Sequence, residues 1–349
     1  MAALLEARHV TKVFGGGRFG KKQGTVALDD FSFRIDAEPP AITAVVGESG
    51  SGKTTLARLL LGLAEPTAGA VLYRGTDLRR LAAADRRRFL RDVQVIFQDP
   101  YEVYNPFYKV DHVLKTPIEK FHLAKTPAAA RALMEETLNA VGLRPDETLG
   151  RHPHQLSGGQ RQRIMVARAL LLQPRLIIAD EPVSMVDASL RATILESLRQ
   201  LHDRFGISIL YITHDLTTAY QISDNSLVMY RGQVAEAGDV DRVVKQPRHP
   251  YTQLLIQSIP QADPSKAWRS EGAADDATVA PGAGGCKFAD RCPAVMDMCR
   301  TAPPPLFRLD ARRAAACYLY RNQPALEGTA LDQVMAPPEA LSGSHVSAD

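Results

Sequence analysis

One eight-residue segment constrains the fold of this 349-residue chain more than any other. Its letters, GESGSGKT over residues 47–54, fit the pattern G-x-x-x-x-G-K-[ST], and a short β-branched run at 42–46 precedes them. A helical pattern follows over 54–63, so the segment predicts a strand, a glycine-rich turn and a helix. Such a turn points backbone N–H groups inward, and the helix N-terminus adds partial positive charge. The segment therefore predicts a phosphate-binding loop in an α/β fold.

Two side chains of this loop have chemistry suited to a nucleotide. Lys53 can reach the β- and γ-phosphates, and the Thr54 hydroxyl can bind Mg²⁺. A glycine-rich turn that only caps a helix is the structural alternative. The candidate cofactor-binding residues of the loop are Gly47, Glu48, Ser49, Gly50, Ser51, Gly52, Lys53, Thr54 and Thr55.

A second apolar run, at 176–179, ends in two carboxylates, Asp180 and Glu181. We expect Asp180 to hold Mg²⁺ through a water and Glu181 to act as general base on the attacking water. A helical pattern at 188–205 and an apolar run at 208–213 follow, and this rhythm predicts a parallel sheet covered by helices.

A further helix N-terminus is indicated by Leu156, Ser157, Gly158, Gly159 and Gln160, which precede a helical pattern to residue 172. Ser157 and the glycine amides could bind a second phosphate. One chain would then carry two anion sites that need not face the same nucleotide.

Composition excludes several other classes of protein. The net charge of +3 is slight and no long Lys/Arg run occurs, so we expect no nucleic-acid partner. The arginines at 86–88 and 91 are typical of a solvated helix face. No stretch is apolar and long enough to cross a bilayer, and the N-terminus does not resemble a secretory signal. We therefore expect a cytoplasmic protein whose four cysteines bind metal or are simply buried.

Taken together, these motifs resemble the nucleotide-binding subunit of an ABC transporter over about residues 3–260. The resemblance implies an ABC cassette of the P-loop NTPase class, with a RecA-like parallel core, an antiparallel β subdomain and an α-helical signature subdomain at about 100–170. It also implies that two cassettes meet head to tail, so that the phosphate loop of one and the 156–160 segment of the other enclose ATP. The partner cassette is a second copy or a homologous chain.

The resemblance assigns four further residues. Phe14 matches the aromatic that stacks on adenine, with a core or surface role as the alternative. Gln98 matches the glutamine that senses Mg²⁺ and contacts membrane subunits, His214 the histidine that contacts the γ-phosphate, and Asp187 the aspartate of the D-loop. That loop ends in Val-Asp where the family more often has Leu-Asp, a volume-tolerant change. We therefore expect a competent ATPase with Lys53, Glu181 and His214 as its catalytic residues.

Three segments resemble the oligopeptide/dipeptide importer subfamily: the residues after Gln98, the His-Pro-Tyr-Thr run at 249–252, and the segment around 285–293. The resemblance implies peptide uptake at the cytoplasmic face of the inner membrane. Two transmembrane permease subunits and, indirectly, an extracytoplasmic solute-binding protein would be its partners. A nickel or oligosaccharide importer is an alternative, and so is a soluble ABC ATPase that acts on DNA or ribosomes.

All four cysteines, Cys286, Cys292, Cys299 and Cys317, fall in the C-terminal part of the chain. Four thiolates can ligate zinc or an iron–sulfur cluster. The resemblance implies a [4Fe–4S] cluster, with zinc and no metal as the alternatives. A regulatory or partner-docking role for the segment is a further hypothesis that is compatible with transport. The predicted organisation is a cassette at 1–260, a small cysteine-containing extension at 261–333 and a disordered tail at 334–349.

Overall fold

The computed structural model describes residues 3–15, 24–36, 38–98, 104–184, 186–259, 284–326 and 330–335. The first part of the extension expected at 261–333, up to residue 283, lies outside this part of the chain. All but two residues of the tail expected at 334–349 also lie outside it, as do the residues directly after Gln98.

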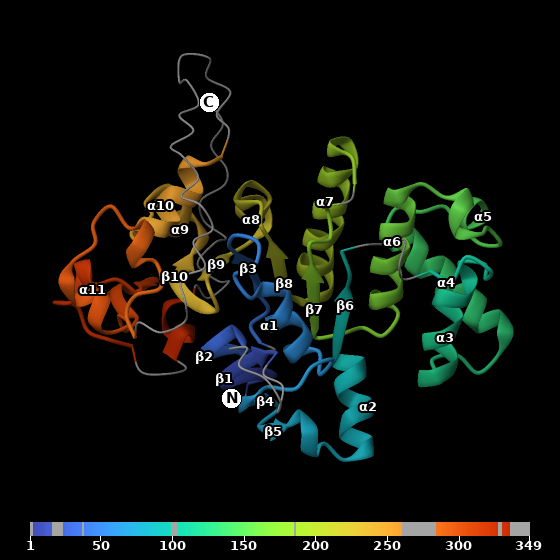
Figure 1. The fold of residues 1–349 in the computed structure, drawn as a ribbon. Helices are drawn as coiled ribbons and strands as arrows, with labels where there is room; N and C mark the ends of the chain where they lie inside the picture. The colour runs from blue at the N-terminus through green and yellow to red at the C-terminus, as the bar shows by residue number, and fades with distance from the viewer. Residues whose placement is uncertain are drawn as a thin grey trace.

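An eight-stranded sheet forms the centre of the molecule, in the order β11-β12-β10-β9-β3-β8-β7-β6 (Figure 1). The strands from β9 to β6 pair in parallel, as the sequence predicted, and β10, β12 and β11 continue the sheet antiparallel. Their bounds are β3 Ile42–Val46, β6 Val93–Ile96, β7 Leu176–Asp180, β8 Ser208–Thr213, β9 Asn225–Tyr230, β10 Gln233–Asp239, β11 Phe307–Asp310 and β12 Arg313–Ala315.

The strands at the middle of this sheet are apolar almost throughout. Every residue of β8 and β9 is buried, and so are all but the last residue of β7. Continuous apolar runs of this kind are expected where helices cover both faces of a parallel sheet. The alternating pattern of a half-exposed strand is therefore missing here.

A second, four-stranded antiparallel sheet has the order β2-β1-β4-β5. Its strands are β1 Leu5–Phe14, β2 Thr25–Ile35, β4 Ala68–Tyr73 and β5 Thr76–Asp77. A shared core of buried side chains, among them Phe31, Leu56 and Leu210, joins this sheet to α1 and to the central sheet. The expected antiparallel subdomain is thus present.

Helices flank the central sheet at both of its edges (Figure 1). The helical subdomain expected at about 100–170 contains three helices between residues 111 and 148, and α6 follows them beside β6. The helices are α1 Lys53–Leu60, α2 Ala83–Asp92, α3 Asp111–Phe121, α4 Pro127–Ala140, α5 Pro145–Thr148, α6 Gly158–Leu170, α7 Ala188–Phe205, α8 Leu216–Ile222, α9 Val240–Lys245, α10 Pro250–Gln257 and α11 Asp297–Thr301.

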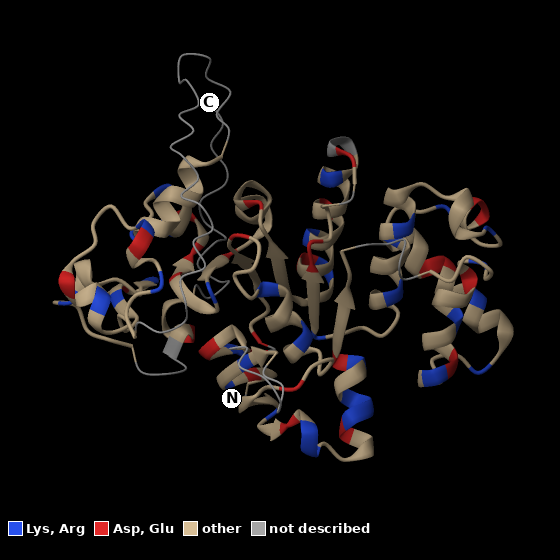
Figure 2. Cartoon of the chain, in the orientation of Figure 1, with Lys and Arg blue, Asp and Glu red and all other residues tan. Residues whose placement is uncertain are grey.

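Two details of the helices bear on the predictions. The helix expected to run to residue 63 ends at Leu60, because Gly62 adopts a left-handed backbone with φ 66 that terminates it. The arginines of α2 lie mostly exposed along one helix, as a solvated face predicts (Figure 2). None of the described helices is both long and apolar enough to span a bilayer.

The cysteine-containing segment is continuous with the central sheet rather than a separate appendage. Strand β12 pairs with β10 in the register Glu236↔Ala315, and β11 pairs with β12. Phe288 of this segment packs its ring 5.3 Å from Tyr230 and 5.5 Å from Tyr251, between ring centroids. An aromatic cluster therefore anchors the segment to the end of β9 and to α10.

This packing predicts a large loss of stability for Phe288→Ala. Phe288 is 2% exposed, so truncation leaves a cavity and should lower the free energy of unfolding by about 3–5 kcal/mol in a urea titration. The control is Leu319→Ala in the same segment, at a side chain that is 49% exposed. Equal effects of the two substitutions would contradict the anchoring role of Phe288.

Candidate functional site

The phosphate-binding loop runs from the end of β3 to the start of α1 and approaches two other backbones closely. Gly47 has φ 154 and Gly52 has φ 105. A Cβ at Gly47 would lie 2.3 Å from the Met229 carbonyl oxygen, and one at Gly52 would lie 2.4 Å from that of Ala27. Only glycine fits at either position, so these two residues set the shape of the loop.

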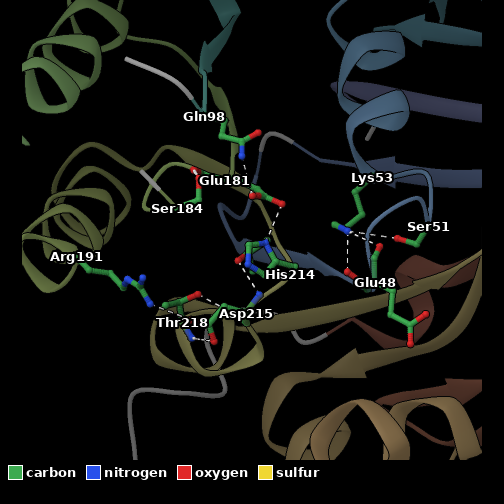
Figure 3. A network of polar contacts seen from close by, with 12 residues as sticks. Glu48, Ser51, Lys53, Gln98, Glu181, Ser184, Arg191, His214, Asp215 and Thr218 are labelled. Atoms are coloured by element: carbon green, nitrogen blue, oxygen red, sulfur yellow. Dashed lines mark hydrogen bonds and ion pairs between the residues drawn. The ribbon is translucent and has the colours of Figure 1, made fainter. Parts of the chain in front are cut away.

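Lys53 is buried inside this loop. Its Nζ donates to the carbonyl oxygens of Gly47 at 2.7 Å and Glu48 at 2.9 Å (Figure 3). Burial lowers the pKa of Lys53, and the carboxylates of Glu181, Asp180 and Glu48 oppose that shift. When a polyphosphate enters the loop, the ammonium group of Lys53 would exchange its hydrogen bonds to these carbonyl oxygens for hydrogen bonds to phosphate oxygens.

Asp180 ends β7 and faces Thr54, whose hydroxyl interacts with its carboxylate. Burial raises the pKa of Asp180, and the neighbouring Glu181 charge raises it further. Its Oδ1 is buried and has no hydrogen-bond partner among the described residues. An unpartnered carboxylate oxygen beside a threonine hydroxyl is a donor set that fits Mg²⁺ or a water bound to it.

Side chains from the ends of the two neighbouring strands contact the Glu181 carboxylate. Gln98, two residues past β6, donates from Nε2 to one carboxylate oxygen at 3.1 Å, and His214, directly after β8, lies with Nδ1 3.0 Å from the other (Figure 3). Because the carboxyl ends of parallel strands meet at one edge, the sequence could place these three residues together. What the sequence did not show is that Gln98 contacts Glu181 itself.

The backbone of Glu181 is strained, with φ 46 in the left-handed region. Its N–H still continues the sheet by donating to the Ile212 carbonyl oxygen at 2.8 Å. A non-glycine residue in this conformation costs free energy, and such strain concentrates at functional sites. The turn at the end of β7 therefore fixes the direction of the carboxylate.

The second predicted anion site is a well-capped helix end. Ser157 caps α6: its Oγ accepts from the Gln160 N–H at 3.2 Å, and Gln160 Oε1 accepts from the Ser157 N–H at 2.9 Å. Gly158 follows at the first helical position. At Gly159 a Cβ would lie 2.7 Å from Leu190 Cδ1, so this glycine lets α6 pack closely on α7.

The two predicted anion sites lie apart within one chain. The loop follows β3, whereas α6 stands beyond β6 at the edge of the sheet, with β8 and β7 between them (Figure 1). The structure thus agrees with the expectation that they need not serve the same nucleotide.

Two other predicted site residues are present but stand apart from the network around Glu181. Phe14 ends β1 with its ring 46% exposed and Lys12 Nζ 5.0 Å from the ring centroid, which leaves the ring open to a planar ligand. Asp187 precedes α7 as its N-cap, exposed and without a side-chain capping bond to the described residues. Their roles remain predictions.

Sequence reasoning missed the residues that fix the chain directly after His214. Asp215 caps α8 by accepting from the Thr217 N–H at 2.8 Å, and Arg191 Nη1 lies 3.3 Å from its carboxylate. An aspartate directly before a helical pattern is an N-cap signal, so Asp215 could have been found. The pairing with Arg191 depends on how α7 and α8 pack, which no local pattern reveals.

The cysteines gather from four separate positions. Cys299 and Cys317 are buried, Cys286 and Cys292 half-buried, and the Cys286 N–H donates to the Cys299 carbonyl oxygen at 2.7 Å. Burial, with a smaller contribution from the other three thiols, raises the pKa of Cys317 to about 11. Within the described ranges, however, no three His, Cys, Asp or Glu side chains are arranged as ligands of one metal ion.

Behind the phosphate loop lies a buried pair of titratable groups. Glu236 accepts from the N–H groups of Arg248 at 3.0 Å and His249 at 2.8 Å, and burial raises its pKa to about 7. His249 accepts the Tyr251 N–H on Nδ1 at 3.0 Å, and burial lowers its pKa to about 4. These contacts start α10 and place Tyr251, whose hydroxyl accepts from the Glu48 N–H at 2.9 Å.

Comparison with known proteins agrees with this architecture. Residues 28–184 match the family model described as ABC transporter, and residues 235–299 match the one described as oligopeptide/dipeptide transporter, C-terminal region. A putative oligopeptide transport ATP-binding protein of Bacillus subtilis, YkfD, is 41% identical over 91% of this chain and 96% of its own length. A di/tripeptide transport ATP-binding protein of Pseudomonas aeruginosa, DppF, is 38% identical over 90% and 97%.

Among solved structures, an ATP-binding cassette determined as a dimer in a post-hydrolysis state with ADP and Pi aligns with a TM-score of 0.58 and 26% identity. The alignment covers 68% of this chain and 98% of the cassette. The loop, the strand-end carboxylates and the sheet order define a P-loop nucleotide-binding fold. Within that class, the chain belongs to the ABC transporter ATP-binding proteins that carry the oligopeptide/dipeptide transporter C-terminal region.

The buried pair behind the loop predicts a pH effect on stability. The pKa of Glu236 rises from 4.5 unfolded to about 7 folded, so its contribution is full below pH 4.5 and is lost as the pH rises to 7. His249 acts oppositely, losing its contribution as the pH falls from 6.5 to about 4. Glu236→Gln removes only the first effect.

The free energy of unfolding of this variant, relative to that of wild type, should therefore increase by on the order of 2 kcal/mol between pH 5 and pH 7.5, as measured by urea unfolding.

The control for this measurement is Glu135→Gln, which removes an exposed carboxylate paired with Arg131. Its difference from wild type should stay the same at both pH values. A pH-independent difference for Glu236→Gln would show that Glu236 titrates alike in the folded and unfolded chain.

Proposed function

We propose that this chain binds and hydrolyses ATP and, paired with a second cassette, energises the import of oligopeptides or dipeptides. The observation that carries the hydrolytic part is the Glu181 carboxylate, which Gln98 and His214 contact at the end of β7. Only β8 separates β7 from β3, the strand that leads into the Lys53 loop. The names of the relatives above support peptides as the transported class. The chain would act at the cytoplasmic face of the membrane, bound to two permease subunits.

Each part of the site has a distinct task in this proposal. The loop N–H groups and Lys53 bind the β- and γ-phosphates, and Thr54 and Asp180 hold Mg²⁺, which neutralises phosphate charge when bound. Glu181 accepts a proton from the attacking water. Gln98 and His214 orient that carboxylate, and His214, 59% exposed at its side chain, can reach the γ-phosphate.

The separation of the two anion sites supports a cassette pair as the working unit. The capped N-terminus of α6 in one chain would cover a nucleotide bound to the loop of the other, with Ser157, Gly158, Gly159 and Gln160 next to its phosphates. Asp187 would lie between the cassettes, and Phe14 would stack on adenine.

An exposed apolar patch supports contact with membrane subunits. Phe107 is 86% exposed and Tyr108 is 52% exposed, and both precede α3 in the segment that follows Gln98. Exposed aromatics that are rimmed by polar residues mark interaction surfaces. Movement of this segment with Gln98 would pass the state of the nucleotide site to the permease subunits.

Two other functions stay open as alternatives. A nickel or oligosaccharide importer would use the same cassette, because the solute is selected by the other subunits. A soluble ABC ATPase without permease partners is the second alternative, and the match to a transporter C-terminal region speaks against it.

Glu181→Gln tests the general base. The amide cannot accept the proton of the attacking water, so the rate of ATP hydrolysis should fall by about 100-fold or more. ATP binding should persist, and ATP-dependent dimers should accumulate in size-exclusion chromatography. Glu196→Gln, at an exposed residue of α7, is the control and should hydrolyse ATP like wild type. Full activity of Glu181→Gln would exclude this role.

We further propose that the four cysteines ligate a [4Fe–4S] cluster, with zinc as the alternative. Their convergence from four separate positions supports it: burial raises the pKa of Cys317, and the other three thiols are near enough to raise it further. The sulfurs are not arranged as a ready ligand set, so ligation would require side-chain rotation in this segment.

Metal analysis of anaerobically purified protein tests this proposal. Iron and sulfide near four each per chain, with a brown chromophore that Cys292→Ser removes, are expected for a cluster of this type. One zinc per chain would support the alternative. Colourless protein free of both metals contradicts metal binding by these cysteines.

A further inference from the structure

The cysteine-containing segment reaches directly into the phosphate-binding loop. Arg291 lies in a short 3₁₀ turn, Ala289–Arg291, just before Cys292. Its Nη1 and Nη2 each lie 2.9 Å from a different oxygen of the Glu48 carboxylate, which makes a bidentate ion pair. Glu48 is the second residue of the phosphate-binding loop, so a residue 243 positions away contacts the loop that would bind ATP.

Two aromatic rings fix the position of the Arg291 guanidinium independently of its ion pair with Glu48. Its guanidinium carbon lies 5.8 Å from the ring centroid of Tyr230 and 5.7 Å from that of Phe288. Both rings belong to the aromatic cluster that also contains Tyr251. Because a guanidinium stacked on aromatic rings keeps little rotamer freedom, the ion pair forms at low entropic cost.

The same cluster also holds the backbone of the loop. Tyr251 accepts from the Glu48 N–H through its hydroxyl, at 2.9 Å. Lys287 donates to the Arg231 carbonyl oxygen at 2.8 Å, and the adjacent Gly232 N–H donates to the carbonyl oxygen of Ser51, also at 2.8 Å. The loop is therefore hydrogen-bonded at Glu48 by Tyr251 of α10 and at Ser51 by the turn between β9 and β10, and Lys287 of the C-terminal segment contacts that turn.

The charge of Glu48 gives this contact a consequence for phosphate binding. A carboxylate in a phosphate-binding loop can occupy the inward N–H groups or pair with the loop lysine, and it repels a polyphosphate. Figure 3 shows the Glu48 side chain turned away from Lys53 and from the Glu181 network. Its carboxylate instead forms the ion pair with Arg291, which turns the side chain away from the phosphate site and neutralises its charge.

We infer that Arg291 is a positioning residue for nucleotide binding, which holds the Glu48 carboxylate out of the phosphate cradle and cancels its charge. The inference rests on the proposed ATP site. If so, the C-terminal segment is part of the nucleotide-binding machinery, because it supplies Arg291, the residue that keeps the Glu48 carboxylate away from the bound phosphates.

The test measures the dissociation constant of the full chain for the fluorescent nucleotide mant-ATP. Arg291→Ala should raise it about three- to tenfold, more at low salt than at high salt, because the freed carboxylate competes with the phosphates. Glu48→Gln removes the charge of this side chain, and the dissociation constant of this variant is the reference for the double variant. In the Glu48→Gln background, Arg291→Ala should have almost no further effect.

The matched control is Arg300→Ala. Arg300 lies in the same segment, 59% exposed, and pairs with Asp290 at 3.3 Å without contacting the loop. It should bind mant-ATP like wild type. If Arg291→Ala does not fold, as judged by thermal unfolding, the comparison is made between Arg291→Lys and Arg291→Lys/Glu48→Gln, since lysine keeps the charge but not both contacts.

Two results overturn the inference. One is an unchanged dissociation constant in Arg291→Ala. The other is an equal loss of affinity with and without Glu48→Gln, which would mean that Arg291 acts only on the fold. Wild-type protein that binds no mant-ATP, or binds it no better than Lys53→Met, contradicts the proposed ATP site itself and is thereby distinguished.

Discussion

At Gly47 and Gly52 the phosphate-binding loop runs so close to the carbonyl oxygens of Met229 and Ala27 that no side chain fits between them. Much of the molecule follows from that close approach. Met229 belongs to the parallel sheet and Ala27 to the antiparallel one, so both sheets must meet at the loop. The packing that joins the two sheets is thus the packing that shapes the phosphate cradle, and a change that separates them would open it.

The strand ends of the parallel sheet could be predicted because their signal is local and their geometry general. Apolar β-branched runs located β3, β7 and β8, and parallel pairing then brought Gln98, Glu181 and His214 to one edge. The direct contacts of Gln98 and His214 with Glu181 depend on the orientation of the side chains, which the sequence pattern does not reveal. The strained backbone of Glu181 has no signal in the sequence either, since glutamate is not a residue that favours φ 46.

The parts that escaped prediction depend on contacts between distant residues. Tyr251 and Glu48 are 203 positions apart, and nothing near either residue indicates the other. Strand β12, Arg313–Ala315, has three residues and no alternation, so only its pairing with β10 and β11 makes it a strand. The cysteines drew attention to the C-terminal segment for their metal chemistry. The structure adds that the same segment contacts the loop through Arg291 and covers a strand.

That covered strand has a consequence for how such a chain can be shortened or extended. The solved cassette described above aligns over 98% of its length with only 68% of this chain. In this chain β10 is an interior strand, paired with β9 on one side and β12 on the other. Without β12 its outer N–H and C=O groups would form an open edge, which is a template for pairing with another chain. The segment therefore covers the outer edge of β10 and moves the edge of the sheet to the four-residue strand β11. A chain cut before this segment would present β10 as a longer open edge, on which two copies could pair.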